Sequence, residues 1–231
     1  MLYNNSSMID SSVCWLKKQC NQCDCDKFCL RLFKLDYLYT EALVPINLRG
    51  RIGLVTDEDK TDRDEFIFLK DISESVEDFV SSGKGLYIHS STAGNGKTSW
   101  ALRILQNYMN KIWITSELKC RALFISVPRL LLALKDNISE KNDYVQHIKD
   151  NILDADLVIW DDIATKQSTV FESENLFSML DARIAAGKAN IYTSNLSDEE
   201  LHSSLGDRLY SRIINMSYDV ELHGKDKRGL K

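Results

Sequence analysis

Residues 86–99 read LYIHSSTAGNGKTS, and this stretch decides the fold. Its first four residues, Leu86–His89, form a short apolar run that predicts a buried strand. Gly94 and Gly96 then permit a tight turn with left-handed backbone angles, and the residues from Thr98 onward (TSWALRILQNYM) have the apolar spacing of a helix. A strand, a glycine-containing turn and a helix in this order predict a loop that binds phosphate through backbone N–H groups.

The side chains of this loop indicate which phosphates it binds. In the pattern G-x-x-x-x-G-K-T the lysine, here Lys97, reaches the β- and γ-phosphates, and the threonine, here Thr98, places its hydroxyl on Mg²⁺. The first position is Ser91 instead of glycine, so the start of the loop is expected to differ slightly, because a side chain resists a positive φ. We predict ATP and Mg²⁺ as cofactors. The predicted nucleotide-binding residues of the loop are Ser91, Ala93, Gly94, Asn95, Gly96, Lys97, Thr98 and Ser99.

A second apolar strand ends in two acids, since Leu157–Trp160 runs directly into Asp161 and Asp162. A buried strand fixes the backbone at this point, so Asp161 can hold Mg²⁺ together with Thr98. Asp162 is placed to orient or deprotonate an attacking water. Such a pair can also cap a helix, but a phosphate-binding loop upstream favours the catalytic interpretation.

Polar residues near the end of the chain extend this prediction. Asn195 ends the run ANIYTSN and could position water against the γ-phosphate, or be a simple turn residue. Arg208 and Arg212 are four residues apart on one helical face, where arginine can stabilise charge on a neighbouring subunit's phosphate or form surface salt bridges. Arg228 and Arg208 are further candidates for nucleotide contacts. The predicted catalytic residues are Lys97, Asp161, Asp162, Asn195 and Arg212.

Strands and helices alternate along the chain from Gly85 onward. The predicted strands are LYIH, ALFISV, LVIW, ANIYTSN and MSYDVEL, the last of them at a sheet edge. Helical patterns between them include PRLLLALKDNI, YVQHIKDNILDA and VFESENLFSMLDARIAAG, which Gly187 can end. Ser197 and Glu200 form a capping box that begins another helix. The alternation predicts an α/β fold in which helices cover both faces of a parallel sheet.

The chain is expected to divide into three parts. Residues 1–45 hold a cysteine cluster and the helical pattern CLRLFKLDYLYTEAL, which Pro45 is expected to end. Residues 46–65 form a linker, and its charge run TDEDKTDRDE is typical of a solvated loop. Residues 66–231 form the nucleotide-binding domain, in which SESVEDFVSSG reads as a short helix ended by Gly83.

Five of the six cysteines crowd together near the N-terminus, at Cys14, Cys20, Cys23, Cys25 and Cys29. The sequence shows no export signal, so metal binding by reduced thiols is expected instead of disulfides. Four thiolates can hold Zn²⁺ in a tetrahedron. Because one residue separates Cys23 from Cys25, we favour Cys14, Cys20, Cys25 and Cys29, with Cys23 as the substitute. An iron–sulfur cluster and metal-free thiols stay open as alternatives.

The composition excludes several classes of protein. The chain has 231 residues, of which 44% are hydrophobic and 27% charged, as expected for a globular core. Its net charge of -5 argues against coating nucleic acid by bulk electrostatics. A DNA contact would need a local patch, for example at Lys225, Lys227 and Lys231, which fit a solvated tail better. Without a spanning apolar run or a signal peptide, we expect no membrane partner and a cytoplasmic location.

The motifs SxxGxGKT, VIWDD, YTSN and LGDRLYSRI, in this order and spacing, resemble the AAA+ ATPases of the DnaC/DnaI helicase-loader group. LFISVPRLLLALK is also similar to that group, and the resemblance covers roughly residues 66–231. It implies an AAA+ core. The sequence stops soon after its last predicted strand, so no C-terminal helical lid is expected, as in loaders and in IstB transposition ATPases. The cysteine-rich, helical N-terminal segment looks most like versions carried by bacteriophages and mobile elements.

This resemblance implies an ATP-dependent loader of the replicative helicase. ATP at Lys97, Thr98, Asp161 and Asp162 would let copies assemble into a homo-oligomer, with Arg212 completing the neighbour's site. The N-terminal segment, as a zinc module, would grip a DnaB-type helicase, and the ATPase would hold single-stranded DNA in the host cytoplasm. Hydrolysis would reset or release the loader. Two alternatives stay open: an IstB-type transposition ATPase acting on duplex DNA, and an ATP-gated adaptor with little turnover.

Overall fold

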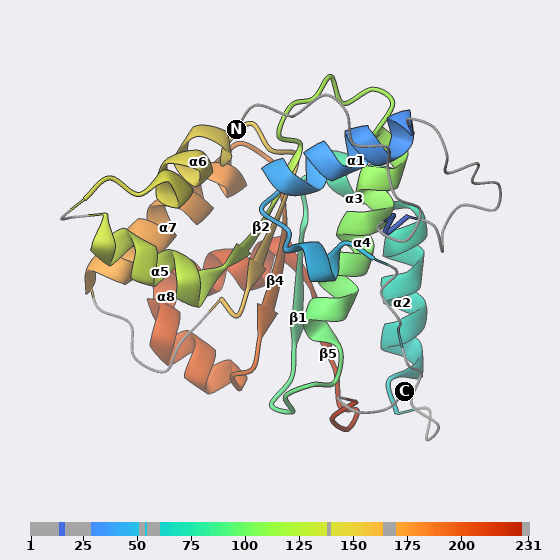
Figure 1. The fold of residues 1–231 in the computed structure, drawn as a ribbon. Helices are drawn as coiled ribbons and strands as arrows, with labels where there is room; N and C mark the ends of the chain where they lie inside the picture. The colour runs from blue at the N-terminus through green and yellow to red at the C-terminus, as the bar shows by residue number, and fades with distance from the viewer. Residues whose placement is uncertain are drawn as a thin grey trace.

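The structure, a computed structural model, describes residues 14–16, 29–50, 54, 61–137, 140–163 and 170–227. These residues form a five-stranded parallel sheet with helices on both faces (Figure 1). The order across the sheet is β2-β3-β4-β1-β5. The strands are β1 (Gly85–His89), β2 (Ala122–Ser126), β3 (Leu157–Asp161), β4 (Ala189–Ser194) and β5 (Ser217–Glu221). The predicted α/β fold and the edge position of the last strand are confirmed.

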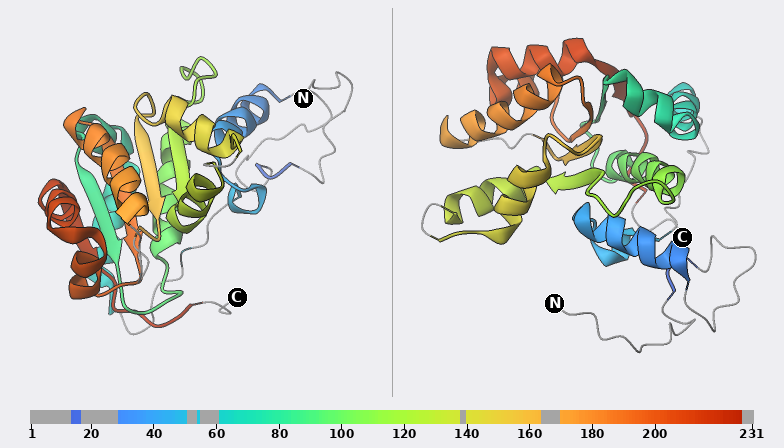
Figure 2. Two further views of the ribbon diagram at one scale, coloured as in Figure 1. Left: turned by 90° about the vertical axis from the view of Figure 1, so that its left-hand side faces the viewer. Right: turned by 90° about the horizontal axis from the view of Figure 1, so that it is seen from above.

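Alternation along the strands directs side chains into two apolar cores, one on each face of the sheet. Leu86 and Ile88 of β1 belong to the first core, and Tyr87 between them belongs to the second. The first core is covered by α1 (Leu30–Glu41), α2 (Arg63–Glu74), α3 (Val76–Ser82) and α4 (Lys97–Ile112). The second is covered by α5 (Val127–Asp136), α6 (Asp143–Asn151), α7 (Val170–Ala185) and α8 (Asp198–Met216). Figure 2 shows the two helical layers from the side and from above.

Several predicted helix ends are found in the structure. The capping box that begins α8 is complete, because the Ser197 hydroxyl accepts from the Glu200 backbone and the Glu200 carboxylate accepts from the Ser197 backbone. Gly83 ends α3 and Gly187 follows α7, both with left-handed φ angles of +66° and +63°. These signals act within a few residues, so the sequence alone specifies them.

Helix α2 corrects the prediction of a solvated loop, because it begins at Arg63, inside the charge run at 56–65. Its charged residues lie on the outer face, whereas Leu69 is fully buried. Phe66 packs edge-to-face on Trp100 of α4, with ring centroids 4.9 Å apart. The apolar face of α2 therefore covers the outer side of α4.

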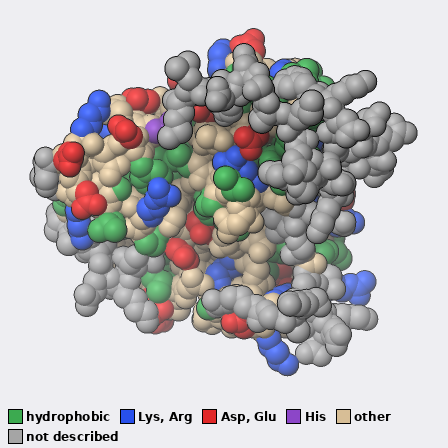
Figure 3. Space-filling model, in the orientation of Figure 1, with side chains coloured by type: hydrophobic (Ala, Val, Ile, Leu, Met, Phe, Trp, Pro, Cys, Tyr) green, Lys and Arg blue, Asp and Glu red, His purple; other side chains and the backbone are tan. Residues whose placement is uncertain are grey.

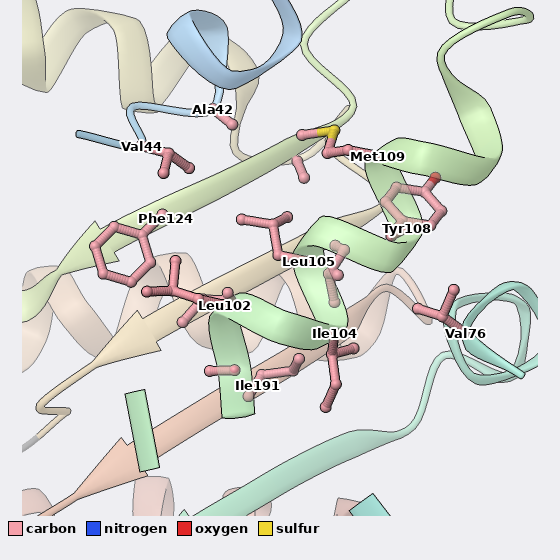
Figure 4. Packing of buried hydrophobic residues seen from close by; sticks show 14 of the residues in the cluster. Ala42, Val44, Val76, Leu102, Ile104, Leu105, Tyr108, Met109, Phe124 and Ile191 are labelled. Carbon is pink, nitrogen blue, oxygen red and sulfur yellow. The ribbon is translucent and has the colours of Figure 1, made fainter. Parts of the chain in front are cut away.

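Helix α1 packs on the nucleotide-binding core. Its buried Leu35 and Leu38 belong to the same apolar cluster as Leu105 of α4, and Figure 4 shows how closely the segment after α1 approaches that helix and β2. The Phe124 backbone N–H, on the edge strand β2, donates to the Ala42 carbonyl at 2.7 Å. α1 ends at Glu41, so the helix stops before Pro45 and not at it.

The end of α1 is set by its own backbone. Leu43 has a left-handed φ of +60°, and the chain then runs through a short 3-10 helix, η2 (Ile46–Leu48).

No helix in the described part of the chain is both long and apolar enough to cross a membrane.

Because all five strands are parallel, their carboxyl ends meet at one edge of the sheet, where polar side chains gather.

Candidate nucleotide-binding site

The loop between β1 and α4 has the backbone that phosphate binding needs. Gly94 and Gly96 have φ angles of +78° and +112°, so the left-handed positions of the loop are both glycines. Ser91 does not adopt a positive φ and is exposed. The expected disturbance from serine at this position therefore has no backbone cause, because an ordinary residue fits there without strain.

Lys97 is turned back onto its own loop and is only 5% exposed. Its Nζ donates to the Thr92 carbonyl at 2.8 Å, to Asn95 Oδ1 at 3.0 Å and to the Ser90 carbonyl at 3.4 Å. Lys97 also stands at the first turn of α4, where the helix dipole favours an anion. A phosphate oxygen at this place would replace one of the loop oxygens that accept from Lys97. It would then interact both with the ammonium group and with the positive end of the α4 dipole.

Asp161, at the end of β3, lies against the first turn of α4. The Thr98 hydroxyl donates to Asp161 Oδ1 at 2.7 Å, and the Thr193 hydroxyl of β4 donates to the same oxygen at 2.8 Å. Burial raises the pKa of the Asp161 carboxyl, and the two hydrogen bonds oppose that change. A hydroxyl and a carboxylate this close, beside a phosphate-binding loop, are ligands that fit Mg²⁺.

Asp162 and Asn195 meet across the carboxyl ends of β3 and β4. Asn195 Nδ2 donates to Asp162 Oδ1 at 2.6 Å, so the structure brings together two residues that the sequence separates by more than thirty positions. Asp162 adopts a left-handed φ of +54°, and its backbone N–H donates to the Thr193 hydroxyl at 3.0 Å. Thr193 thus bonds to both acids.

Thr193 was missed as a functional residue by the sequence reasoning. It is completely buried, and its single hydroxyl accepts from Asp162 and donates to Asp161. Its role could have been predicted from the sequence, because Thr193 is a polar residue within the largely apolar run ANIYTSN. This run forms β4, which pairs with the strand that ends in the two acids. Buried hydroxyls need partners, and here the partners are the candidate catalytic groups.

Arg208 and Arg212 lie on the same side of α8, as predicted from their spacing. Both guanidinium groups lie over the Phe177 ring of α7, at 4.8 Å and 6.0 Å from its centroid. Arg212 also forms an ion pair with Asp181, so the salt-bridge alternative describes its state in an isolated chain. A break in α8 at Gly206, with φ +75° and ψ 161°, separates these arginines from the first half of the helix.

Some predicted site residues lie outside the described part of the chain, namely Cys20, Cys23, Cys25 and Arg228. Cys14 and Cys29 are described, half-buried and free. Cys29 Sγ accepts from the Leu32 backbone N–H at 3.4 Å, so this cysteine caps α1. Within the described ranges no cluster of three or more His, Cys, Asp or Glu could hold a metal ion. The zinc site therefore stays a prediction.

Several solved structures have a fold similar to that of this chain. The DnaC helicase loader matches with a TM-score of 0.63 and 18% identity over 77% of this chain and 99% of that chain. DnaI matches with a TM-score of 0.58 and 23% identity over 80% of this chain and 94% of that chain. The fold is that of the DnaC and DnaI proteins. The fold expected from the resemblance to the loader group is therefore confirmed.

The replication initiator DnaA, bound to AMPPCP and single-stranded DNA, has a TM-score of 0.55 and 19% identity over 75% of this chain. The match covers 49% of that DnaA chain, so this chain corresponds to about half of it. No protein-family model matches the sequence, and neither does any curated protein.

Proposed function

We propose that this protein is an ATPase that loads the replicative helicase onto single-stranded DNA. The observation that carries the ATPase proposal is a continuous chain of hydrogen bonds at the carboxyl edge of the sheet. It runs from Thr98 through Asp161, Thr193 and Asp162 to Asn195. Lys97 stands next to Thr98, so the groups that we propose to bind phosphate, hold the metal and orient water lie close together. The fold that carries them is shared with DnaC and DnaI.

Each residue has a distinct role in the proposed hydrolysis. The loop backbone and Lys97 bind the phosphates, and Thr98 with Asp161 would hold Mg²⁺, which neutralises charge on the phosphate oxygens when bound. Asp162 orients the attacking water and accepts its proton. Asn195 holds the Asp162 carboxylate in place through the 2.6 Å hydrogen bond and can also contact the water. Turnover by the wild type that exceeds that of Asp162→Asn would exclude a non-hydrolysing adaptor.

The position of the arginines supports the proposed homo-oligomer. Arg212 lies over α7 and pairs with Asp181. In the proposed assembly its guanidinium leaves Asp181 for the γ-phosphate held by the next copy. Breaking the Arg212–Asp181 ion pair costs little free energy, because a half-exposed ion pair contributes little to stability.

The helicase partnership rests on the loader fold and on the N-terminal segment. The direct test is native mass spectrometry of the full chain with the replicative DnaB-type helicase of the host, with and without ATP. A defined complex supports the loader proposal. Free helicase beside free ATPase, with ATP present, contradicts it. Asp161→Asn is a useful companion, because it should reduce the ATP-dependent part of the complex without changing the N-terminal segment.

The zinc module is tested in the same samples. We expect one Zn²⁺ per chain, lost in a variant in which Cys20 and Cys25 are replaced by serine. Cys120→Ser is the matched control: Cys120 is buried, donates to the Glu41 and Ala122 carbonyls, and lies in the core. Metal content below one equivalent in the wild type, or metal retained by the double variant, contradicts the proposed ligands.

The DNA partner separates the loader from a transposition ATPase. Acidic and basic side chains of the described residues are interspersed on the face seen in Figure 3. Because the net charge is also negative, at -5, we expect any DNA contact to be local. A candidate is the outer face of α5, where Arg129 lies 4.3 Å from the Tyr144 ring centroid. A cation beside an aromatic ring suits stacking with unpaired bases.

Fluorescence anisotropy with labelled oligonucleotides measures DNA binding at this surface. We expect ATP-dependent binding of single-stranded DNA that is weakened by Arg129→Ala and retained by Lys149→Ala, a control that removes one exposed charge from α6. A clear preference for duplex DNA would instead favour the IstB-type function.

A further inference from the structure

The chain that follows β5 crosses the phosphate-binding loop. This segment, residues 222–227, is called the strap below. The Leu222 backbone N–H donates to the His89 carbonyl at 2.9 Å, at the point where β1 enters the loop. The Lys227 backbone N–H donates to the Gly94 carbonyl, also at 2.9 Å. Figure 1 shows this red segment at the lower edge of the sheet, near the beginning of α2.

Asp62 fastens the strap to the rest of the protein. Its Oδ1 accepts from the His223 backbone N–H at 2.7 Å, and its Oδ2 accepts from the Gly224 backbone N–H at 2.9 Å. The residue is 7% exposed, so this pair of charge-assisted bonds is largely shielded from water. The partners are more than 160 positions apart in the sequence.

Asp62 stands at a position where its carboxylate would be expected to bond to its own helix. It is the N-cap residue of α2, where aspartate ordinarily accepts from the backbone of the first turn. Here the side chain makes no capping hydrogen bond, and both of its oxygens bond to the strap instead. Helix capping therefore does not account for the aspartate.

Asn95 connects the strap to the lysine of the loop. It is 2% exposed, and its Nδ2 donates to the Ser90 hydroxyl at 2.7 Å and to the Leu222 carbonyl at 3.2 Å. Its Oδ1 accepts from Lys97 Nζ at 3.0 Å. One buried amide thus joins the strap to the group that is proposed to bind phosphate.

We infer that Asp62 is a positioning residue for the nucleotide site: by holding the strap, it keeps the Gly94–Lys97 part of the loop in its phosphate-binding shape. The inference rests on the proposed ATP binding. The loop bonds from Lys227 and Asn95 depend on where the strap lies, and the strap is held by Asp62. Loss of the carboxylate therefore loosens the loop at a distance, without removing any group that touches the nucleotide.

The test uses the full chain and the variant Asp62→Asn, whose side chain offers a single acceptor oxygen to two N–H donors. Hydrogen exchange in the nucleotide-free protein should show lost protection at residues 223 and 224 and also at Lys227, which Asp62 does not touch. ATP affinity, measured by calorimetry, should weaken about tenfold, because binding must then also order the loosened loop. Asp64→Asn, an exposed acid in the same helical turn, is the matched control and should resemble the wild type.

A second variant separates the strap from local effects on α2. Gly224→Pro removes the N–H that Asp62 Oδ2 accepts and leaves α2 unchanged. It should reproduce the loss in ATP affinity, and the double variant should lose no more than either single one, because both changes break the same link. Additive losses would overturn the inference, and so would unchanged ATP affinity in a chain whose strap is unprotected, or a strap that stays protected at Lys227 in Asp62→Asn.

The outcome for the wild type distinguishes this inference from the proposed function. A wild-type chain that binds no ATP refutes both the ATPase proposal and the role of Asp62 in it, even if exchange shows the strap in place. A wild-type chain that binds ATP, with an Asp62→Asn variant that binds it equally well, refutes the role of Asp62 alone.

Discussion

The two halves of the candidate site are built differently. In the phosphate half, Asn95, Lys97 and Thr193 are at most 5% exposed. Lys97 donates to Asn95, and the Thr193 hydroxyl bonds to the two acids. In the arginine half, Arg208 is exposed and Arg212 is half-buried against α7. All the groups of the phosphate half come from one chain. The arginine half presents cations at the surface, as expected of groups that act on another copy.

From this difference we expect some variants to change ATP binding and others to change ATP hydrolysis alone. Preorganised buried groups determine how tightly the nucleotide binds, because their geometry is fixed before it arrives. In the proposed assembly the exposed arginines would act only on the transition state of the neighbouring copy's reaction.

The largest effect is expected for Arg212→Ala. Hydrolysis should fall about 1,000-fold, within the range of arginine fingers, while the affinity for ATP stays unchanged. Steady-state turnover and calorimetry measure the two quantities. Asp181→Asn is the control, since it removes the partner of Arg212 in the same chain and should keep hydrolysis at or above the wild-type rate. Weaker ATP binding in Arg212→Ala would place the arginine in its own chain's site.

Asp162→Asn should reduce hydrolysis about 100-fold or more, because the amide cannot accept the proton of the attacking water. ATP affinity should be retained, since Asp162 touches Asn195 and not the loop. A burst experiment with radiolabelled ATP separates chemistry from product release. Equal turnover in variant and wild type would favour the adaptor over the ATPase.

Lys97→Ala should weaken ATP binding about 100-fold, because the ammonium that is proposed to bind the phosphates is lost. Lys84→Ala is the control, as Lys84 is exposed and lies over the Tyr218 ring on the edge strand β5. Calorimetry gives both affinities. ATP binding by Lys97→Ala with wild-type affinity would mean that the nucleotide lies elsewhere.

Ser91→Gly should have the smallest effect, a change in ATP affinity of less than about threefold. The reason is that Ser91 already occupies ordinary backbone space, so glycine relieves no strain there. A tenfold gain on restoring glycine would show that the serine does disturb the loop.

The sequence allowed prediction of features that depend on neighbours in the chain. The strands, the glycines of the loop and the capping box of Ser197 and Glu200 follow from spacing and local chemistry. Thr193, Asp62 and the strap did not follow, because their hydrogen bonds join residues that are brought together only by the sheet. Helix α2 was missed for another reason: its charged face hid a short apolar stripe that becomes meaningful only against α4.

In the proposed assembly, one chain supplies the phosphate half of each site and a second chain supplies the arginine. Mixing Arg212→Ala with Asp162→Asn, each expected to be nearly inactive alone, tests this division. In mixed assemblies the intact phosphate half of the first variant meets the intact Arg212 of the second. We expect hydrolysis to recover to a substantial fraction of the wild-type rate as the two variants are titrated together. Turnover that stays at the sum of the separate variants would contradict it.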